Sequence, residues 1–285
     1  MTTNRCMLVL CLLGCGQDKT PMVSDGAPEE EDTGGAPPPI EVGGSELVGI
    51  GAATLILGES DLLIINRFGG DGSEDQTIIP EATFDLEAFW IDRYPFPGLE
   101  GEDWFVDGLN HEMAAQLDAW LVDYGRRACT VTELLYAAAG PDNHRYPYGD
   151  GSFDISACDP DDSNPQPLGT YNRCESALGI RDFQVRSSWG RLDAQIIAVM
   201  QDTPQAAGFP GDYTHAVWGG TSRSDTFYAP NNYGFHLHDL LEDPYQDDGF
   251  RVCAGPEAPT AEQDAAYSYW LEDLIRAGSY EVLFE

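Results

Sequence analysis

The sequence predicts an α+β domain with few short strands, two to three helices and long loops. Residues 47–57 and 78–91 are rich in Ile, Leu, Val, Thr and Phe and are interrupted by Gly or Pro, which is typical of short strands. Apolar residues at helical spacing follow these segments and return near the end of the chain. Residues 141–233 are rich in Gly, Pro, Asn and Asp, so we expect mostly loops there, with few regular elements, interrupted by apolar stretches at 196–200 and 215–218.

The first predicted helix begins after Asn110, which can cap it, and ends at Gly125. We expect its acidic residues on the exposed face. Its apolar residues recur at helical spacing and are Met113, Leu117, Trp120, Leu121 and Tyr124.

The other two predicted helices carry capping signals of their own. Thr130 and Glu133 occupy the positions of a capping box, and Gly140-Pro141 ends the helix that they begin. Thr260, with Gln263 three residues later, caps the last helix. The apolar face of this helix is expected to pack back onto the domain and consists of Tyr267, Trp270, Leu271 and Leu274.

Composition and charge exclude several functions. The chain has 285 residues, of which 42% are hydrophobic, so it can build a core. Its 14 Lys+Arg against 49 Asp+Glu give a net charge of −35, which excludes a basic surface for nucleic acid. Lys19 is the only lysine, so a Schiff-base or P-loop mechanism in the folded part would lack its essential residue.

The N-terminus has the pattern of an export signal. Arg5 precedes the apolar residues 6–13, a run far shorter than the ~20 residues that a spanning helix needs. The run ends in Leu12-Leu13-Gly14-Cys15, which resembles the lipobox of bacterial lipoproteins. This resemblance implies a signal peptide of residues 1–14, lipid attachment at Cys15 and anchoring to a membrane of the cell envelope. A simple secretory signal is the alternative.

Three further segments are expected after the signal. Residues 15–45 form an acidic Pro/Gly linker that cannot bury enough surface to fold. Residues 46–256 form the folded domain, and residues 257–285 form a C-terminal helical extension. Gly16 after the acylated cysteine favours the outer membrane, by resemblance to lipoproteins of Gram-negative bacteria.

Cysteine usage in the folded part indicates disulfides. Four of the seven cysteines lie downstream of the signal, with no CxxC pair that would start a zinc site. In an exported chain, two disulfides are favoured over free thiols or a metal site. The four residues are Cys129, Cys158, Cys174 and Cys253.

Several sequence blocks resemble one protein family. Gly51-Ala-Ala-Thr-Leu-Ile-Leu-Gly58 and Phe89-Trp-Ile-Asp-Arg-Tyr94 are strand-like blocks. The block Gly125-Arg-Arg-Ala-Cys-Thr-Val-Thr-Glu-Leu-Leu-Tyr-Ala-Ala138 is followed by Arg145-Tyr-Pro-Tyr-Gly149. The series ends with Gly179-Ile-Arg-Asp-Phe183, Trp218-Gly-Gly-Thr-Ser222 and Gly249-Phe-Arg-Val-Cys253. In sequence and order, these blocks resemble the formylglycine-generating enzyme (sulfatase-modifying factor) family over residues 46–256.

This resemblance implies a fold and a disulfide pairing. The family has an irregular α+β fold related to C-type lectins, with few strands and long loops. In such a fold Cys129 lies near Cys253, while Cys158 and Cys174 flank one loop. The resemblance therefore implies disulfides Cys129–Cys253 and Cys158–Cys174.

The same resemblance implies that the family's oxidase site is absent. Members that convert cysteine to formylglycine bind copper(I) with two cysteines shortly before the closing block. No cysteine occurs here between Cys174 and Cys253. Residues 184–190 also lack the Asn and Glu of the family's calcium site, so no cofactor is expected, with calcium as the alternative.

Other possible metal ligands have simpler interpretations. Oxygen ligands occur in an acidic loop that lacks the EF-hand offsets, so a solvated loop is favoured. They are Asp159, Asp161, Asp162 and Asn164, with Asp150 and Asp154 nearby. His236 and His238 share one strand face, but no third ligand can be named. His144 is interpreted as a hydrogen-bonded structural residue.

Two functions of different classes remain. The favoured one is a non-catalytic, surface-tethered binding or structural module that contacts a peptide, a glycan or a partner protein through its loops. The alternative is an oxidoreductase of the formylglycine-generating type, or another metal-assisted enzyme of that family. Aromatic residues in loop-like stretches could form the recognition surface, namely Trp104, Phe105, Trp218, Phe227, Tyr228 and Tyr233.

Overall fold

The computed structural model describes most of the folded part of the chain and none of the predicted signal peptide. The described residues are 45–57, 63–68, 74–79, 82–101, 109–144, 146–149, 155–158, 167–183, 187–201, 214–218, 233–237 and 248–277. They belong to one compact unit, Val42–Glu285. Cys15 and the linker up to residue 44 lie outside them.

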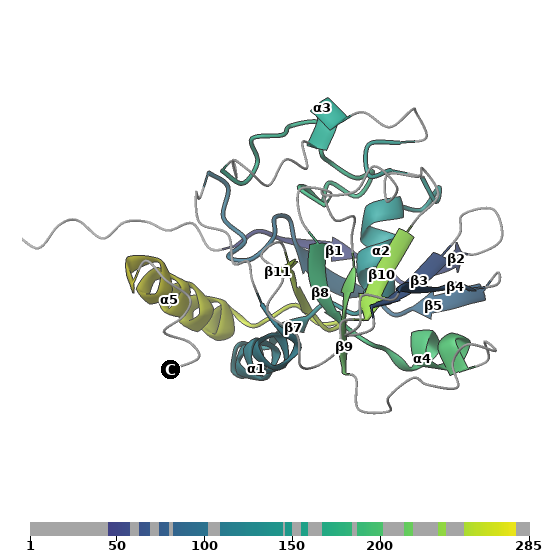
Figure 1. The fold of residues 1–285 in the computed structure, drawn as a ribbon. Helices are drawn as coiled ribbons and strands as arrows, with labels where there is room; N and C mark the ends of the chain where they lie inside the picture. The colour runs from purple at the N-terminus through teal and green to yellow at the C-terminus, as the bar shows by residue number, and fades with distance from the viewer. Residues whose placement is uncertain are drawn as a thin grey trace, which may run out of the picture. The chain divides into compact units, whose positions relative to one another are not determined.

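A four-stranded antiparallel sheet holds the ends of the domain together (Figure 1). Its strands, in spatial order, are β1 (Leu47–Ile50), β6 (Phe89–Asp92), β12 (Val252–Ala254) and β7 (Arg126–Ala128). The last strand among the described residues, β12, therefore lies between β6 and β7.

A six-stranded sheet mixes parallel and antiparallel pairs. Its order is β11 (Asp248–Phe250), β8 (Ser187–Arg191), β9 (His215–Trp218), β10 (Tyr233–Leu237), β3 (Leu63–Phe68) and β4 (Glu74–Ile79). The pairs β11–β8 and β10–β3 are parallel, and the others are antiparallel. A separate antiparallel pair consists of β2 (Ala53–Leu57) and β5 (Ala82–Leu86). Short strands were expected in both segments, 47–57 and 78–91, and both contain them.

The capping signals define the helices. In α1 (His111–Leu121), the Asn110 side chain accepts a hydrogen bond from the Met113 N–H. A 3-10 turn, η1 (Val122–Tyr124), extends α1 to Gly125, whose φ of 67° is left-handed. In α2 (Val131–Ala139) both halves of the predicted capping box form. In α5 (Ala261–Ala277), the hydroxyl of Thr260 accepts from the N–H of Gln263.

The region expected to consist mostly of loops contains two further helices and several strands. The helices are α3 (Ile155–Cys158) and α4 (Ala194–Gln201), and α4 covers the apolar stretch 196–200. The second apolar stretch, 215–218, is β9. Mixed helices and small sheets confirm the α+β class.

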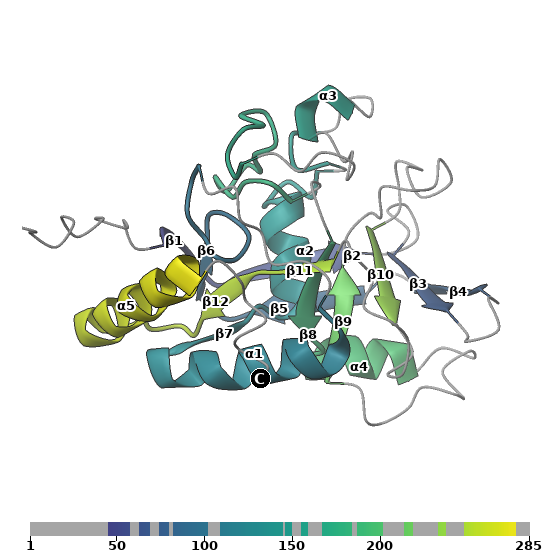
Figure 2. The same ribbon diagram turned by 60° about the vertical axis from the view of Figure 1, so that its left-hand side comes forward.

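Two apolar clusters form the core. One packs α2 against β2, β5 and β6, with Leu55, Phe84 and Leu134 among its buried residues. The other joins α1 and α5 to β12, and Tyr267, Leu271 and Leu274 of α5 are buried there, as predicted for its apolar face. Figures 1 and 2 show α1 and α2 on opposite sides of β8. Among the described residues, no helix is long and apolar enough to cross a membrane.

Candidate functional site

The downstream cysteines form two disulfides among the described residues. Cys129 is joined to Cys253, and Cys158 is joined to Cys174, the pairing that the family resemblance implied. All four side chains are buried. No thiol of the described residues is therefore available as a nucleophile or a soft metal ligand.

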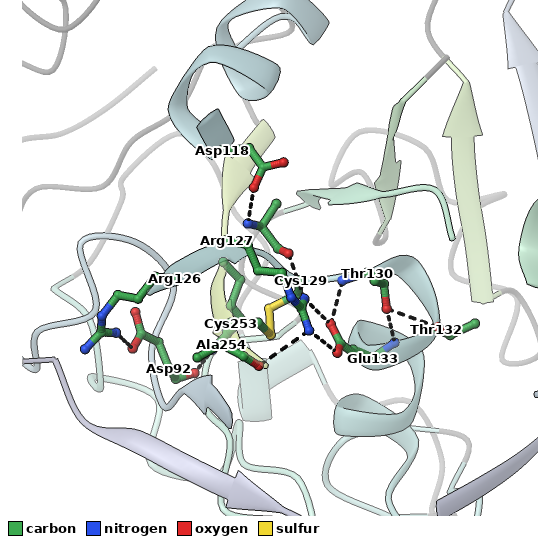
Figure 3. Close-up of a disulfide and its surroundings, with 12 residues drawn as sticks. Asp92, Asp118, Arg126, Arg127, Cys129, Thr130, Thr132, Glu133, Cys253 and Ala254 are labelled. Atoms are coloured by element: carbon green, nitrogen blue, oxygen red, sulfur yellow. Dashed lines mark hydrogen bonds and ion pairs between the residues drawn. A yellow bond between two sulfur atoms is a disulfide. The ribbon is translucent and has the colours of Figure 1, made fainter. Parts of the chain in front are cut away.

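The Cys129–Cys253 disulfide links the start of α2 to β12 beside a charged pair (Figure 3). The guanidinium of Arg127 donates two hydrogen bonds, of 2.7 and 2.6 Å, to the two carboxylate oxygens of Glu133. Glu133 also accepts from the N–H of Thr130 as part of the capping box. The block from Gly125 to Ala138 is thus fixed by a helix cap, a bidentate ion pair and a disulfide at once.

Arg251 lies between β11 and β12 and is completely buried. Its guanidinium donates to the backbone carbonyls of Asp92 and Arg93, at 2.9 and 3.0 Å, and to that of Arg181 at 2.6 Å. Burial lowers the pKa of Arg251 to about 10, against the attraction of Asp182 and Asp92. Three blocks that are far apart in the sequence, ending at Tyr94, Phe183 and Cys253, therefore meet at one guanidinium.

Asp92 forms a buried ion pair next to this point. Its Oδ1 accepts from Arg126 at 3.2 Å, and Arg126 also donates to Asp264 of α5 at 3.0 Å. The guanidinium of Arg126 lies 4.0 Å from the centre of the Tyr267 ring. Burial raises the pKa of Asp92 to about 6, although Arg126 and Arg251 both lower it. The pair ties α5 to the four-stranded sheet.

Asp118 is the centre of a second polar cluster. Its Oδ1 accepts from the N–H of Ala128 at 2.6 Å and from Arg191 at 2.8 Å. Its Oδ2 accepts from Nε of Arg191 and contacts Nε2 of His215 at 3.1 Å. Burial alone would raise the pKa of Asp118, but the hydrogen bonds from His215, Arg191 and Ala128 outweigh it and lower the pKa. This carboxylate therefore joins α1 to β7, β8 and β9.

The cluster approaches the surface at Thr214. The Thr214 hydroxyl lies 2.9 Å from Nδ1 of His215 and 3.4 Å from Nε2 of His111. Burial lowers the pKa of His111, and the neighbouring His215 lowers it further. Hydroxyl, imidazole and carboxylate thus follow one another in the order of a general-base relay.

Arg191 distinguishes this cluster from such a relay. Its guanidinium forms a bidentate pair with Asp118 and balances the charge of that carboxylate. The four acceptor positions of Asp118 are also filled. The arrangement is therefore best explained as a structural junction.

The possible metal ligands that the sequence offers lie mostly outside the described residues. No three His, Cys, Asp or Glu side chains gather there to hold a metal ion. His236 lies in β10, opposite Asn66 of β3. The N–H of His144 donates to the carbonyl of Ala139 at the end of α2. The other candidates are Asp150, Asp154, Asp159, Asp161, Asp162, Asn164 and His238, and all of them lie outside the described residues.

The proposed aromatic recognition surface also lies largely outside the described residues. Trp218 lies in β9 and Tyr233 in β10, so both are in strands instead of loops. The other members, Trp104, Phe105, Phe227 and Tyr228, lie outside the described residues.

The expectation that the acidic residues of the first helix lie on its exposed face is wrong for Asp118, which is 5% exposed. The sequence holds a signal for this burial. Asp118 falls in the same helical stripe as Ala114, Leu117 and Leu121, all of which are buried. Its partners Arg191 and His215 are far away in the sequence and could not be identified from it.

The chain matches no protein-family model and has no significant match among curated proteins.

Proposed function

We propose that the chain is an exported, lipid-anchored and non-catalytic binding or structural module on a scaffold like that of the formylglycine-generating enzymes. The observation that carries the non-catalytic part is the closure of Cys129, Cys158, Cys174 and Cys253 in two disulfides. A copper(I) site of the family's type needs two reduced cysteines close together. The four downstream cysteines, closed in disulfides, do not fit a copper(I) ion.

The scaffold part of the proposal is supported by the way the resembling blocks pack. The block ending at Tyr94 pairs with the closing block, with Ile91 opposite Cys253. Arg251 of the closing block also donates to a backbone carbonyl of the block ending at Tyr94 and to one of the block ending at Phe183. Blocks that resemble one family in sequence and order thus meet in a single buried core, as parts of one fold would.

The polar cluster at Asp118 offers no competing catalytic site. Its acceptors are saturated by groups of the protein itself, and Arg191 balances its charge. Loops held on a disulfide-linked core are suited to recognition of a peptide, glycan or protein. A binding or structural role is therefore the function that the described residues support best.

A turnover assay tests this proposal. The full chain, with its disulfides intact and loaded with copper(I), is incubated in oxygen with a peptide bearing the sulfatase Cys-x-Pro-x-Arg motif. We expect no conversion of thiol to aldehyde by mass spectrometry beyond that of copper alone. Conversion above that control, lost after heat unfolding of the chain, would contradict the proposal and support the oxidoreductase alternative.

A further inference from the structure

The two-stranded sheet β2–β5 has outward backbone groups on each of its two edges. Asp85 uses its N–H and carbonyl to bond the side chain of Gln195, so its backbone points away from β2. In an antiparallel pair the residue opposite, Thr54, also directs its backbone N–H and carbonyl away from the partner strand. Because this direction alternates along a strand, the backbone groups of Ile56, two residues further along β2, point outward as well. The carbonyl of Ile56 accepts from Asn143, which confirms this orientation.

On the outer edge of β5, a side-chain amide hydrogen-bonds to the backbone as the peptide group of a neighbouring strand would. Nε2 of Gln195 in α4 donates to the carbonyl of Asp85 at 2.7 Å, and its Oε1 accepts from the N–H of Asp85 at 2.8 Å. A side-chain amide carries the same donor and acceptor as a peptide group. This edge is therefore protected from pairing with another chain.

The outer edge of β2 is far less protected by the described residues. The described residues make one hydrogen bond to it, the 3.2 Å bond from Asn143 to the carbonyl of Ile56. The strand reads Ala-Thr-Leu-Ile-Leu and has none of the charges or prolines that usually block an edge. Thr54 is exposed, and the Ile56 side chain is 54% exposed beside the edge. A strand of this kind is a template for β-pairing.

We propose that an extended, basic peptide segment of a partner protein binds the outer edge of β2 as an added strand. This inference rests on the proposed binding function and names its partner class. The backbone of Thr54 and the N–H of Ile56 supply the ladder, and the Ile56 side chain contacts an apolar residue of the peptide.

Charge decides between possible occupants of this edge. The carboxylate of Asp85 is exposed on the same face as Thr54 and Ile56. The chain as a whole carries a charge of −35, so it attracts a cationic peptide. Two copies of the chain repel each other, which disfavours pairing of β2 with β2 of a second molecule.

The test uses the full chain and a synthetic nine-residue peptide of alternating Lys or Thr and Val. Hydrogen exchange should slow at least tenfold at the Thr54 and Ile56 amides when the peptide is added. The same peptide with Glu in place of Lys should bind at least tenfold more weakly. Protection elsewhere but not on β2, or no protection at a saturating concentration, would overturn the proposal.

Matched variants locate the binding edge. Ile56→Lys should weaken peptide binding at least tenfold, while Val122→Lys, at a similarly exposed aliphatic residue, should have little effect. Thr54→Pro removes an outward N–H of β2, and Thr83→Pro makes the same change on the outer edge of β5. Only Thr54→Pro should weaken peptide binding. If the two lysine variants, or the two proline variants, lose affinity equally, the outer edge of β2 is not the binding site.

Two further outcomes separate this inference from other occupants of the edge and from the proposed non-catalytic function. Strong protection of the Thr54 and Ile56 amides without any peptide would show that the chain itself or a second copy occupies the edge, and would overturn the proposal. Failure of the peptide to bind leaves the non-catalytic function standing, because the turnover assay tests that function independently.

Discussion

At the scale of single residues, buried charges decide how the elements of this domain are joined. Asp118 receives hydrogen bonds from groups on β7, β8 and β9. Burying a carboxylate is costly unless it is paired and its acceptors are filled, and here both conditions hold. The residue is therefore a point where the loss of one charge affects several elements together.

Asp118→Asn should lower the free energy of unfolding by about 3 kcal/mol, because the amide cannot balance the charge of Arg191 or accept all of the present hydrogen bonds. This is the lower end for a broken buried pair, since the Arg191 side chain is 35% exposed and water can take up part of its charge. Urea denaturation with the disulfides intact measures the change. Asp123→Asn, at an exposed residue of η1, should change stability by less than about 0.5 kcal/mol. Similar effects of both substitutions would contradict the role given to Asp118.

Asp92 should make an unusual contribution to the pH dependence of stability. Its pKa is raised from 3.8 to about 6 in the folded chain, so the folded state binds a proton more tightly than the unfolded state. The contribution of this carboxyl to stability is then fully present below its unfolded pKa and is lost as pH rises through about 6.

The comparison of Asp92→Asn with the parent chain isolates this contribution. The parent should gain stability relative to the variant by up to about 3 kcal/mol as pH falls through this window. Denaturation series at several pH values measure the difference. A difference that does not vary with pH would show that Asp92 binds its proton equally tightly in the folded and unfolded states, and would contradict the raised pKa.

At the scale of elements, signals that are local in the sequence predicted helices well. Each helix cap joins residues only three positions apart, and each forms as predicted. The caps are Asn110, the Thr130–Glu133 capping box and the Thr260–Gln263 pair. Strand pairing depends on distant partners, so β3 and its parallel pairing with β10 could not be predicted. The same reason explains why Asp118 was misplaced, because its burial depends on Arg191 and His215.

The extension formed by α5 shares a core with the rest of the domain. The contribution of its buried side chains to the stability of the domain can therefore be measured by substitution. Leu271→Ala, at a completely buried residue, should cost about 2 to 5 kcal/mol of stability. Tyr269→Ala, on the same helix but 66% exposed, should cost less than about 0.5 kcal/mol. Thermal unfolding followed by near-ultraviolet circular dichroism compares the two. Equal small effects would mean that α5 contributes little to the folded domain.

At the scale of the whole molecule, the proposed anchor is a lipid on Cys15. Cys15→Ser should release the chain from the membrane fraction into the soluble fraction, because one or more acyl chains would then be missing. Labelled fatty acid should be incorporated into the parent chain and not into the variant. Retention of the variant in the membrane fraction, together with absence of label from the parent, would contradict lipid attachment.

The position of β12 in the four-stranded sheet also has a consequence for the timing of folding. This strand is the last one within the part of the chain that the structure describes, yet it lies between β6 and β7. Synthesis proceeds at about 5–20 residues per second, and the sheet cannot close until Ala254 has been made. In this order β7 joins the pair β1–β6 only through β12, so the two parts of the sheet remain separate until the segment that contains β12 has been made.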